Sequence, residues 1–390
     1  MRRNLRALGA FNFCNDFRVY APITVVYFTS VTGSFALGTL LFSIAKIAAV
    51  LFEVPTGVFS DRIGRRLTLL LGQFASLASI ASYALGHGFE VLTLGAVLEG
   101  LAFSFFSGNN DALLYDTLRV EGAQDHFAEW QGRVSALFQL ALAISAAVAI
   151  VALYFHVSLR ALFVLSLVPQ AVGIVFAALL VEPARSGAIA SNIFAHMGEA
   201  LAGFARNARL RELSLASMLN FALGEGMHMF QPAFFALLWP AWALGAAGVL
   251  IHGLGALGFR LGGALIRRFR EFPVLLGTNA GARLTGIAAL AIPTVASPAI
   301  VALASVYYGP TVVAQAALQQ RAFSDAQRAT MASLISLGGN LLFALAVFAI
   351  GALADRVGPR FALLTAEILS IPVLFLFWRL ARAERVEART

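Results

Sequence analysis

The chain has 390 residues, of which 59% are hydrophobic and only 12% are charged, and its mean hydropathy is +0.82. A soluble domain has about 25% charged residues, so this composition excludes a soluble globular protein and predicts helices surrounded by lipid. The formal net charge of +8 does not indicate a nucleic-acid-binding protein, because the arginines stand at the ends of apolar segments.

Apolar segments long enough to cross a bilayer, about 20 residues each, follow one another along the chain. The first contains Asp16 and Arg18 and lacks a cleavage site of small residues, so we interpret it as a retained span and not as a signal peptide. The expected spans are 7–32, 36–60, 67–86, 90–118, 127–155, 159–181, 211–239, 243–266, 273–292, 297–322, 329–353 and 358–380.

One long polar interval, 183–210, divides these twelve spans into two sets of six. We therefore expect an N-terminal half (1–182), a cytoplasmic linker (183–210) and a C-terminal half (211–390), with an amphipathic helix on the membrane surface at 193–204. Basic residues gather on the cytoplasmic side of membrane proteins. With both termini in the cytoplasm, only Arg160, Arg356 and Arg360 fall outside, so we expect a multi-pass protein of the plasma (inner) membrane in this orientation.

A charged decapeptide, Gly-Val-Phe-Ser-Asp-Arg-Ile-Gly-Arg-Arg at 57–66, lies between the second and third spans. Its pattern resembles the signature that the major facilitator superfamily carries in the cytoplasmic loop between helices 2 and 3. The resemblance implies an all-α membrane protein with twelve helices in two six-helix halves. It also implies alternating access to a substrate site between the halves, near the midplane of the bilayer.

Several residues of this loop have a physical use. Gly57 permits close helix packing, Asp61 can accept hydrogen bonds from a helix N-terminus, and Arg65 and Arg66 can pair with carboxylates or lipid phosphate. The resemblance implies that Asp61 meets helix 11 and latches one state, and that Asp116 pairs with a loop arginine. The expected gating residues are Glu53, Gly57, Asp61, Arg62, Gly64, Arg65, Arg66 and Asp116. The alternative is a basic anchor in which Asp61 only caps a helix.

The decapeptide has two partial copies. Residues 263–272 align with 57–66 in the second half and keep the basic residues without the aspartate. Residues 351–360, between the last two spans, read Gly-Ala-Leu-Ala-Asp-Arg-Val-Gly-Pro-Arg. A tight loop with helix caps is the simpler interpretation of this second copy, and its role stays open.

Ionisable residues inside a membrane are costly and usually functional. The resemblance implies that helices 1, 4, 7 and 10 line the central cavity. The candidate substrate and proton site residues are Asp16, Arg18, Lys46, Glu99, Glu225, His228, Gln231 and Tyr307. Lys46 either binds an anionic solute or neutralises Asp16 or Glu99. Arg283 and Glu367 fall on helices that face lipid in the family, which favours a structural role for them.

Glu225 stands between Gly224 and Gly226 in the seventh span. Two glycines weaken the helix there, and apolar surroundings favour the neutral form of a carboxylate. Glu225 or Asp16 is therefore our candidate proton carrier. The alternative for Glu225 is a simple pair with His228, one helical turn away.

We therefore expect a secondary active transporter of a small organic solute, coupled to protons, without cofactor or metal, and monomeric as is usual in the family. An uncoupled facilitator and a receptor or scaffold on the same fold are the alternatives. Drug–proton antiporters carry an arginine where this chain has Ala96, so that branch is not favoured. An enzyme is not expected, because no nucleophile–base pair, phosphate loop or metal-ligand spacing is present.

Overall fold

The structure is a computed structural model, which describes residues 2–183, 207–322 and 328–387. Every regular element in these ranges is a helix. The chain separates into two compact units, Met1–Gly187 with Pro240–Val249 (unit 1) and Ala188–Trp239 with Leu250–Thr390 (unit 2). The amphipathic helix expected at 193–204 lies outside the described residues.

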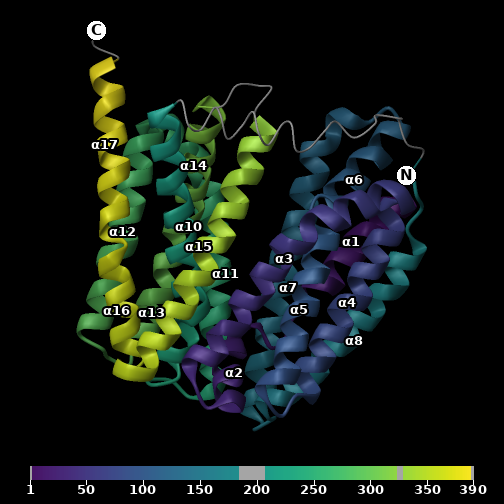
Figure 1. The fold of residues 1–390 in the computed structure, drawn as a ribbon, viewed down its shortest axis with the longest axis horizontal. Coiled ribbons are helices and arrows are strands. Elements are labelled where there is room, and N and C mark those ends of the chain that lie inside the picture. The colour runs from purple at the N-terminus through teal and green to yellow at the C-terminus, as the bar shows by residue number, and fades with distance from the viewer. Residues whose placement is uncertain (1, 184–206, 323–327, 388–390) are drawn as a thin grey trace. The chain divides into compact units, whose positions relative to one another are not determined.

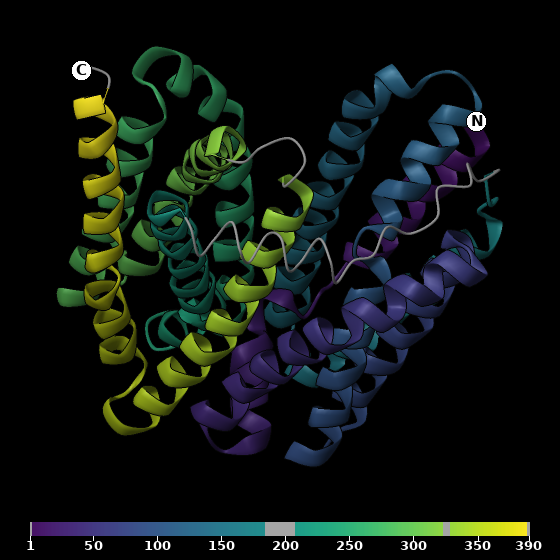
Figure 2. The ribbon, with the colours of Figure 1, turned by 45° about the horizontal axis from the view of Figure 1, so that its top comes forward.

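Unit 1 is built from helices that run side by side (Figures 1 and 2). Helix α5 packs on both α3 and α4, and α8 packs on α1 and α4. Its elements are α1 (Arg2–Asp16), η1 (Ala21–Ile23), α2 (Thr24–Thr32), α3 (Phe35–Ile63), α4 (Arg65–Leu85), α5 (Phe89–Phe106), α6 (Asn109–Val120), η2 (Gln124–His126), α7 (Phe127–Tyr154) and α8 (Leu159–Leu179).

Unit 2 is built in the same way, with α10 packed along α15, and α12 packed on α14 and α16. Helix α11 begins in the segment that groups with unit 1 and continues into unit 2. The elements are α10 (Ala208–Phe235), α11 (Ala241–Phe269), α12 (Glu271–Ala291), α13 (Ser297–Leu303), η3 (Ala304–Tyr307), α14 (Tyr308–Ala322), α15 (Arg328–Val357), α16 (Pro359–Leu369) and α17 (Ile371–Glu387).

Ten helical segments of the described chain are long and apolar enough to cross a membrane, and they match ten of the twelve predicted spans. The seventh span is present as α10, which is long enough but more polar. The prediction of an unbroken first span at 7–32 is wrong, because α1 ends at Asp16 and α2 begins at Thr24. The fourth, tenth and twelfth spans are also interrupted, by Ser107 and Gly108, by η3 and by Ser370.

Proline accounts for two of these breaks. A proline ring inside a helix collides with the carbonyl group four residues earlier and removes one hydrogen bond. Pro22 and Pro310 place this conflict at Arg18 and Val306, and both residues lie outside α-helix. Prolines within α3, α8 and α10 are accommodated without a break in the helix, so the presence of a proline does not by itself decide where a helix ends.

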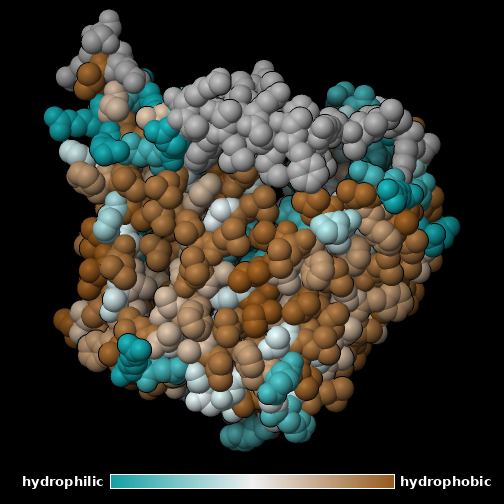
Figure 3. Space-filling model, in the orientation of Figure 1, coloured by the Kyte–Doolittle hydropathy of each residue, from teal (hydrophilic) through white to brown (hydrophobic). Residues whose placement is uncertain are grey.

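The surface of each unit is far more apolar than that of a soluble protein. Large apolar side chains such as Leu51, Val168 and Leu284 are two-thirds exposed, whereas Gln73 and Gln170 are fully buried. On the face shown in Figure 3, apolar side chains cover the middle of the helices and hydrophilic ones collect at their ends. A lipid environment explains this distribution, because helices in lipid associate through close packing and polar contacts rather than through burial of apolar surface.

Two arginines that depart from the predicted basic-inside pattern cap helix ends. Arg160, the second residue of α8, donates from Nη2 to the carbonyl of Gly86 at 2.9 Å, just beyond the C-terminus of α4. Arg360, the second residue of α16, donates to the carbonyls of Leu290 and Ala291 at 2.7 Å each, at the C-terminus of α12. The two units thus repeat one device, in which an arginine satisfies carbonyls that have no partner within their own helix.

The charged decapeptide and its two copies share one backbone conformation. Gly64 links α3 to α4 with φ 102° and ψ 154°, and Gly358 links α15 to α16 with φ 83° and ψ 161°. Arg270, which aligns with Gly64, links α11 to α12 with φ 67° and ψ 171°. This region of φ and ψ angles is populated almost only by glycine, and it costs other residues about 1–3 kcal/mol. The copy at 263–272 therefore keeps the backbone conformation of the link, although arginine stands in place of glycine.

We predict that Arg270→Gly raises the stability of the protein by about 1 kcal/mol or more, because glycine adopts this conformation without strain. Thermal unfolding in detergent measures the change. Arg270→Ala is the matched control, since it removes the same side chain and leaves the strain. Equal melting temperatures for the two variants would contradict the prediction.

Candidate functional site

The break between α1 and α2 is held open by two polar residues of α8. The amide Nε2 of Gln170 donates to the carbonyl of Asn15 at 2.8 Å and lies 3.4 Å from that of Cys14. One turn earlier, Ser166 Oγ accepts the backbone N–H of Val19 at 3.0 Å. Backbone groups that lose their helical partners must find others when buried, and α8 supplies them.

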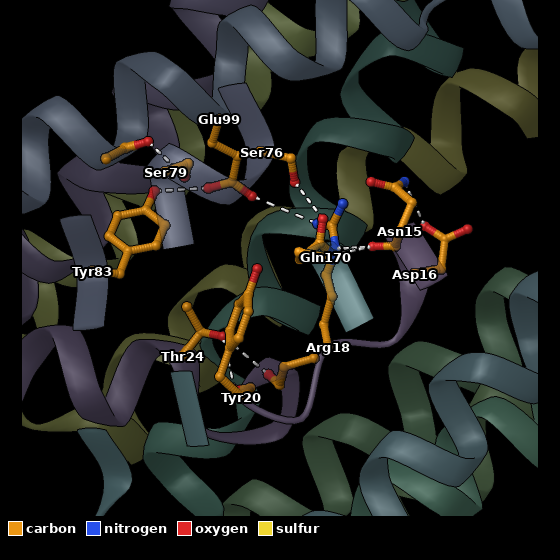
Figure 4. A network of polar contacts seen from close by, with 12 residues as sticks. Asn15, Asp16, Arg18, Tyr20, Thr24, Ser76, Ser79, Tyr83, Glu99 and Gln170 are labelled. Atoms are coloured by element: carbon orange, nitrogen blue, oxygen red, sulfur yellow. Dashed lines mark hydrogen bonds and ion pairs between the residues drawn. The ribbon is translucent and has the colours of Figure 1, made fainter. Parts of the chain in front are cut away.

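Gln170 also joins the break to α4. Its Oε1 accepts from Gln73 Nε2 at 2.8 Å and from Ser76 Oγ at 3.0 Å. Figure 4 shows the Gln170 amide between Ser76 on one side and the end of α1 on the other. One fully buried amide thus connects α1, α4 and α8, which makes the break a fixed part of unit 1.

Arg18 extends from this break toward Glu99 of α5 (Figure 4). Its Nη1 lies 3.7 Å from Glu99 Oε1, and the two side chains are 30% and 35% exposed. The distance is too long for a hydrogen bond. A second contact orients the guanidinium, since Nε donates to the carbonyl of Asn15 at 3.3 Å. Asp16, the last residue of α1, accepts from Asn15 Nδ2 at 3.3 Å, so the break brings Asp16, Arg18 and Glu99 into one region.

Glu99 has a hydrogen-bond donor of its own. Tyr83 of α4 donates its hydroxyl to Glu99 Oε2 at 2.7 Å. The Tyr83 ring packs on Phe163, and Tyr27 donates its hydroxyl to the Tyr83 carbonyl at 2.7 Å. A Cβ atom on Gly95 would lie 2.7 Å from the Tyr83 ring, so this glycine leaves the space that the ring needs. Glu99 is therefore positioned by residues of three other segments.

A small cavity of about 40 Å³ borders these charges. Arg18, Tyr20, Ser76, Glu99 and Phe103 are among the residues that line it. Lys46 of α3 approaches the same region, with its Nζ 4.7 Å from the centre of the Phe103 ring. About 10–15 Å³ accommodates one water molecule by this measure, so the cavity has room for a few water molecules or for one small polar group.

The other predicted site residues lie in unit 2. Glu225, His228 and Gln231 stand on α10 and are partly buried. Glu225 lies near Tyr308 of α14, and His228 lies near His252 of α11. Tyr307, the last residue of η3, packs against Gly281. These residues stay candidates for the substrate and proton site.

Arg283 and Glu367 form a tight ion pair inside unit 2. Arg283 Nη1 lies 2.9 Å from Glu367 Oε2, and the side chains are only 14% and 11% exposed. The pair joins α12 to α16, and Arg283 also approaches the sulfur of Met227 on α10. Its position between three helices supports the structural role that we favoured for it.

The N-terminus of α4 is capped by Glu182, a residue that the sequence reasoning missed. Its carboxylate accepts the backbone N–H groups of Arg65 at 2.9 Å and Arg66 at 2.7 Å. Asp61 is therefore not the cap of α4, and it lies exposed in the last turn of α3. Its contact with helix 11, the eleventh span, stays a prediction. A Cβ atom on Gly64 would lie 2.9 Å from the Glu182 carboxyl carbon, so the glycine allows the cap as well as the turn.

Asp116 lies beside the charged loop, as the resemblance implies. Arg65 Nε donates to Asp116 Oδ2 at 3.1 Å, and Arg119 Nη2 lies 3.2 Å from the other carboxylate oxygen. Asn109, at the start of α6, accepts from Arg65 and from Ser60. The loop is thus tied to α6 within unit 1. Glu53, Gly57 and Arg62 lie exposed along α3, and the gating role of all these residues stays a prediction.

The missed residues had visible but ambiguous signals. Glu182 precedes a proline directly after an apolar span, and Gln73 and Gln170 are amides inside apolar spans. Polar side chains in such spans often bond to neighbouring helices, yet a sequence does not say to which. Tyr83 gave no signal, because an aromatic residue is ordinary at such a position.

We predict that Gln170→Leu lowers the stability of the protein by about 3 kcal/mol, because several buried groups lose their partner and each costs about 1–3 kcal/mol. Thermal unfolding in detergent measures the loss. Gln139→Leu of α7 is the matched control, since the buried Oε1 of Gln139 has no hydrogen-bond partner among the described residues. A similar loss in both variants would show that the Gln170 network does not stabilise the break.

We predict that Glu182→Ala destabilises the protein by about 1–2 kcal/mol, because two N–H groups lose their acceptor and the helix dipole loses a compensating charge. The same unfolding measurement applies. Glu129→Ala removes an exposed carboxylate of α7 and serves as the control. If the two losses are equal, the cap does not contribute to stability.

Comparisons with known proteins agree with this architecture. The family model described as Major Facilitator Superfamily matches residues 7–347. An uncharacterized MFS-type transporter, YxaM of Bacillus subtilis (strain 168), is 28% identical over 111 residues, which are 28% of this chain and only 27% of that relative.

Solved structures share the fold over almost the whole chain. The nucleoside transporter NupG superposes with a TM-score of 0.81 at 16% identity, covering 97% of this chain and 98% of that one. The D-xylose-proton symporter gives 0.74 at 12% identity, covering 96% of each. These likenesses confirm the predicted all-α membrane fold. Members of the matched family move small solutes across the bilayer and are not enzymes. By the family model that covers most of its length, the chain belongs to the major facilitator superfamily.

Proposed function

We propose that this transporter moves a small organic solute by alternating access and couples the movement to protons. The observation that supports the proposal is the broken first helix: Arg18 follows the break and lines a cavity together with Glu99, and Asp16 ends α1 two residues earlier. Broken helices form substrate and ion sites in secondary transporters, because unwound backbone is tolerated in a membrane only where it lines a cavity or is buried in protein.

The charges at the break suit proton coupling. Asp16 and Glu99 are two carboxylates near one guanidinium, and Arg18 interacts electrostatically with both. Uptake of a proton by either carboxylate changes which of them Arg18 attracts. Glu225 in unit 2 is the other candidate carrier. Proton-coupled transport therefore needs no group beyond those that the chain provides.

The charged loop supports alternation between states. Glu182 and Asp116 hold Gly64, Arg65 and Arg66 in a fixed geometry, while Asp61 remains at the surface of unit 1. We propose that Asp61 makes the state-dependent contact and that Glu53, Gly57 and Arg62 surround it. We further propose a monomer in the plasma (inner) membrane with both termini in the cytoplasm.

The names of the structural neighbours are compatible with an organic solute. One is a nucleoside transporter and another is a D-xylose-proton symporter. Those substrates belong to those proteins, since identities of 16% and 12% support the fold alone. What they contribute is that this fold accommodates polar organic solutes and, in one case, protons.

The test begins with a search for a ligand. Purified protein in detergent is screened for thermal stabilisation by organic anions, cations, zwitterions and neutral solutes at acidic and neutral pH, because a ligand of the folded state raises stability by mass action. The solute found is then followed into proteoliposomes that contain the protein.

We predict that an imposed proton gradient drives accumulation of this solute, that a protonophore abolishes it, and that Asp16→Asn or Glu225→Gln removes accumulation while leaving exchange of solute across the membrane. Glu129→Gln is the control, because it neutralises an exposed carboxylate. Uptake that ignores the gradient and both substitutions would indicate an uncoupled facilitator. Binding without any movement of solute would indicate a receptor or scaffold.

A further inference from the structure

We infer that the solute is a zwitterion, with a negative and a positive group separated by only a few bonds, as in an α-amino acid or a betaine, and that Arg18 binds the negative group and Glu99 the positive one. This inference rests on the proposed function, since it assigns the substrate class of the same site. Three properties of the Arg18–Glu99 pair carry it.

The pair is open, in contrast to the structural pair of unit 2. Arg18 and Glu99 stand 3.7 Å apart and are about one-third exposed, whereas Arg283 and Glu367 stand 2.9 Å apart and are nearly buried. Charged groups in a membrane close on each other when nothing holds them apart. Here the carbonyl of Asn15 orients Arg18, and the hydroxyl of Tyr83 orients Glu99. The gap is therefore built into the site.

The charges around the gap are balanced. Arg18 and Lys46 contribute two positive charges, and Asp16 and Glu99 contribute two negative ones. A solute with a single charge would add an uncompensated charge to this balanced site in a region of low dielectric, which is costly. A zwitterion satisfies both members at once and leaves the net charge of the site unchanged.

The cavity fits the head of such a solute. Its volume of about 40 Å³ holds about three non-hydrogen atoms if one water needs about 10–15 Å³. A carboxylate has that size. Tyr20, Ile80, Phe103 and Phe106 add apolar and aromatic walls, and Lys46 lies over the Phe103 ring. The site thus offers the Glu99 carboxylate to a positive group and the Arg18 guanidinium to a negative one.

The test compares each zwitterion with its two singly charged analogues. The first set is L-leucine, isopentylamine and 4-methylpentanoate, and the second is L-phenylalanine, phenethylamine and 3-phenylpropionate. Glycine betaine, tetramethylammonium and acetate form the third set. Uridine and D-xylose represent neutral solutes. Dissociation constants are measured by calorimetry on the full-length protein in detergent, and the wild-type comparison needs no variant to fold.

We expect at least one zwitterion to bind about tenfold or more tightly than both of its analogues, because each analogue makes only one of the two charged contacts and adds a net charge to the site. In Glu99→Gln the acid analogue should bind as well as the zwitterion, and in Arg18→Gln the amine analogue should do so. Glu129→Gln and Arg133→Gln neutralise an exposed ion pair of the same unit and should leave all constants unchanged.

Several outcomes overturn the inference. Equal binding of an acid and its zwitterion would assign an anion-binding site, and binding of uridine or D-xylose alone would assign a neutral solute. Lack of binding by every zwitterion would also exclude the class. Transport assays on whichever solute binds separate the two claims. Transport of a neutral solute would support the proposed function and contradict the zwitterion. Binding of a zwitterion that does not cross the membrane would support the ligand class and contradict transport.

Discussion

The contact between Gln170 and the end of α1 is the interaction on which unit 1 depends. A chain cannot leave helical geometry inside a membrane unless its freed backbone groups find other partners. Gln170 and Ser166 provide those partners from one face of α8, and Gln73 and Ser76 fix the Gln170 amide from α4. Because the break is held in place, Arg18 can occupy a position that no residue of a continuous helix would take.

The same principle operates at the ends of the helices, where carboxylates and guanidinium groups satisfy backbone groups that lack helical partners. Glu182 accepts two N–H groups of α4, and Arg160 and Arg360 donate to carbonyls at the C-termini of α4 and α12. These charged side chains therefore stabilise helix ends. From the sequence alone, arginines are interpreted only by the rule that basic residues mark the cytoplasmic side. Inside the spans, the tight Arg283–Glu367 pair joins helices in the same way, whereas the Arg18–Glu99 pair is more open and is the proposed site.

The internal repeat shows that the backbone conformation of the charged loop is a constraint on how the flanking helices are joined. Its three copies use one backbone conformation, and one of them retains it at Arg270 despite the strain. A link of one residue between long helices leaves little freedom in how they diverge, so the repeat preserves geometry even where it has lost the residue that fits best. The loop of unit 1 combines this link with Glu182 and Asp116, and this combination distinguishes it from the other two copies.

The sequence by itself determined the lipid environment, the family resemblance and the approximate positions of the spans, because these follow from composition, local hydropathy and a short motif. It also identified Asp16, Arg18 and Glu99, since charges inside apolar segments are visible without a structure. The tertiary structure decided which spans are broken, because Pro22 interrupts a helix where Pro55 does not, and only packing partners distinguish them. It also supplied Tyr83, Gln170 and Glu182, whose partners lie 16 to 155 residues away in the chain. Long-range hydrogen bonds leave no local pattern, and for that reason only the folded chain shows them.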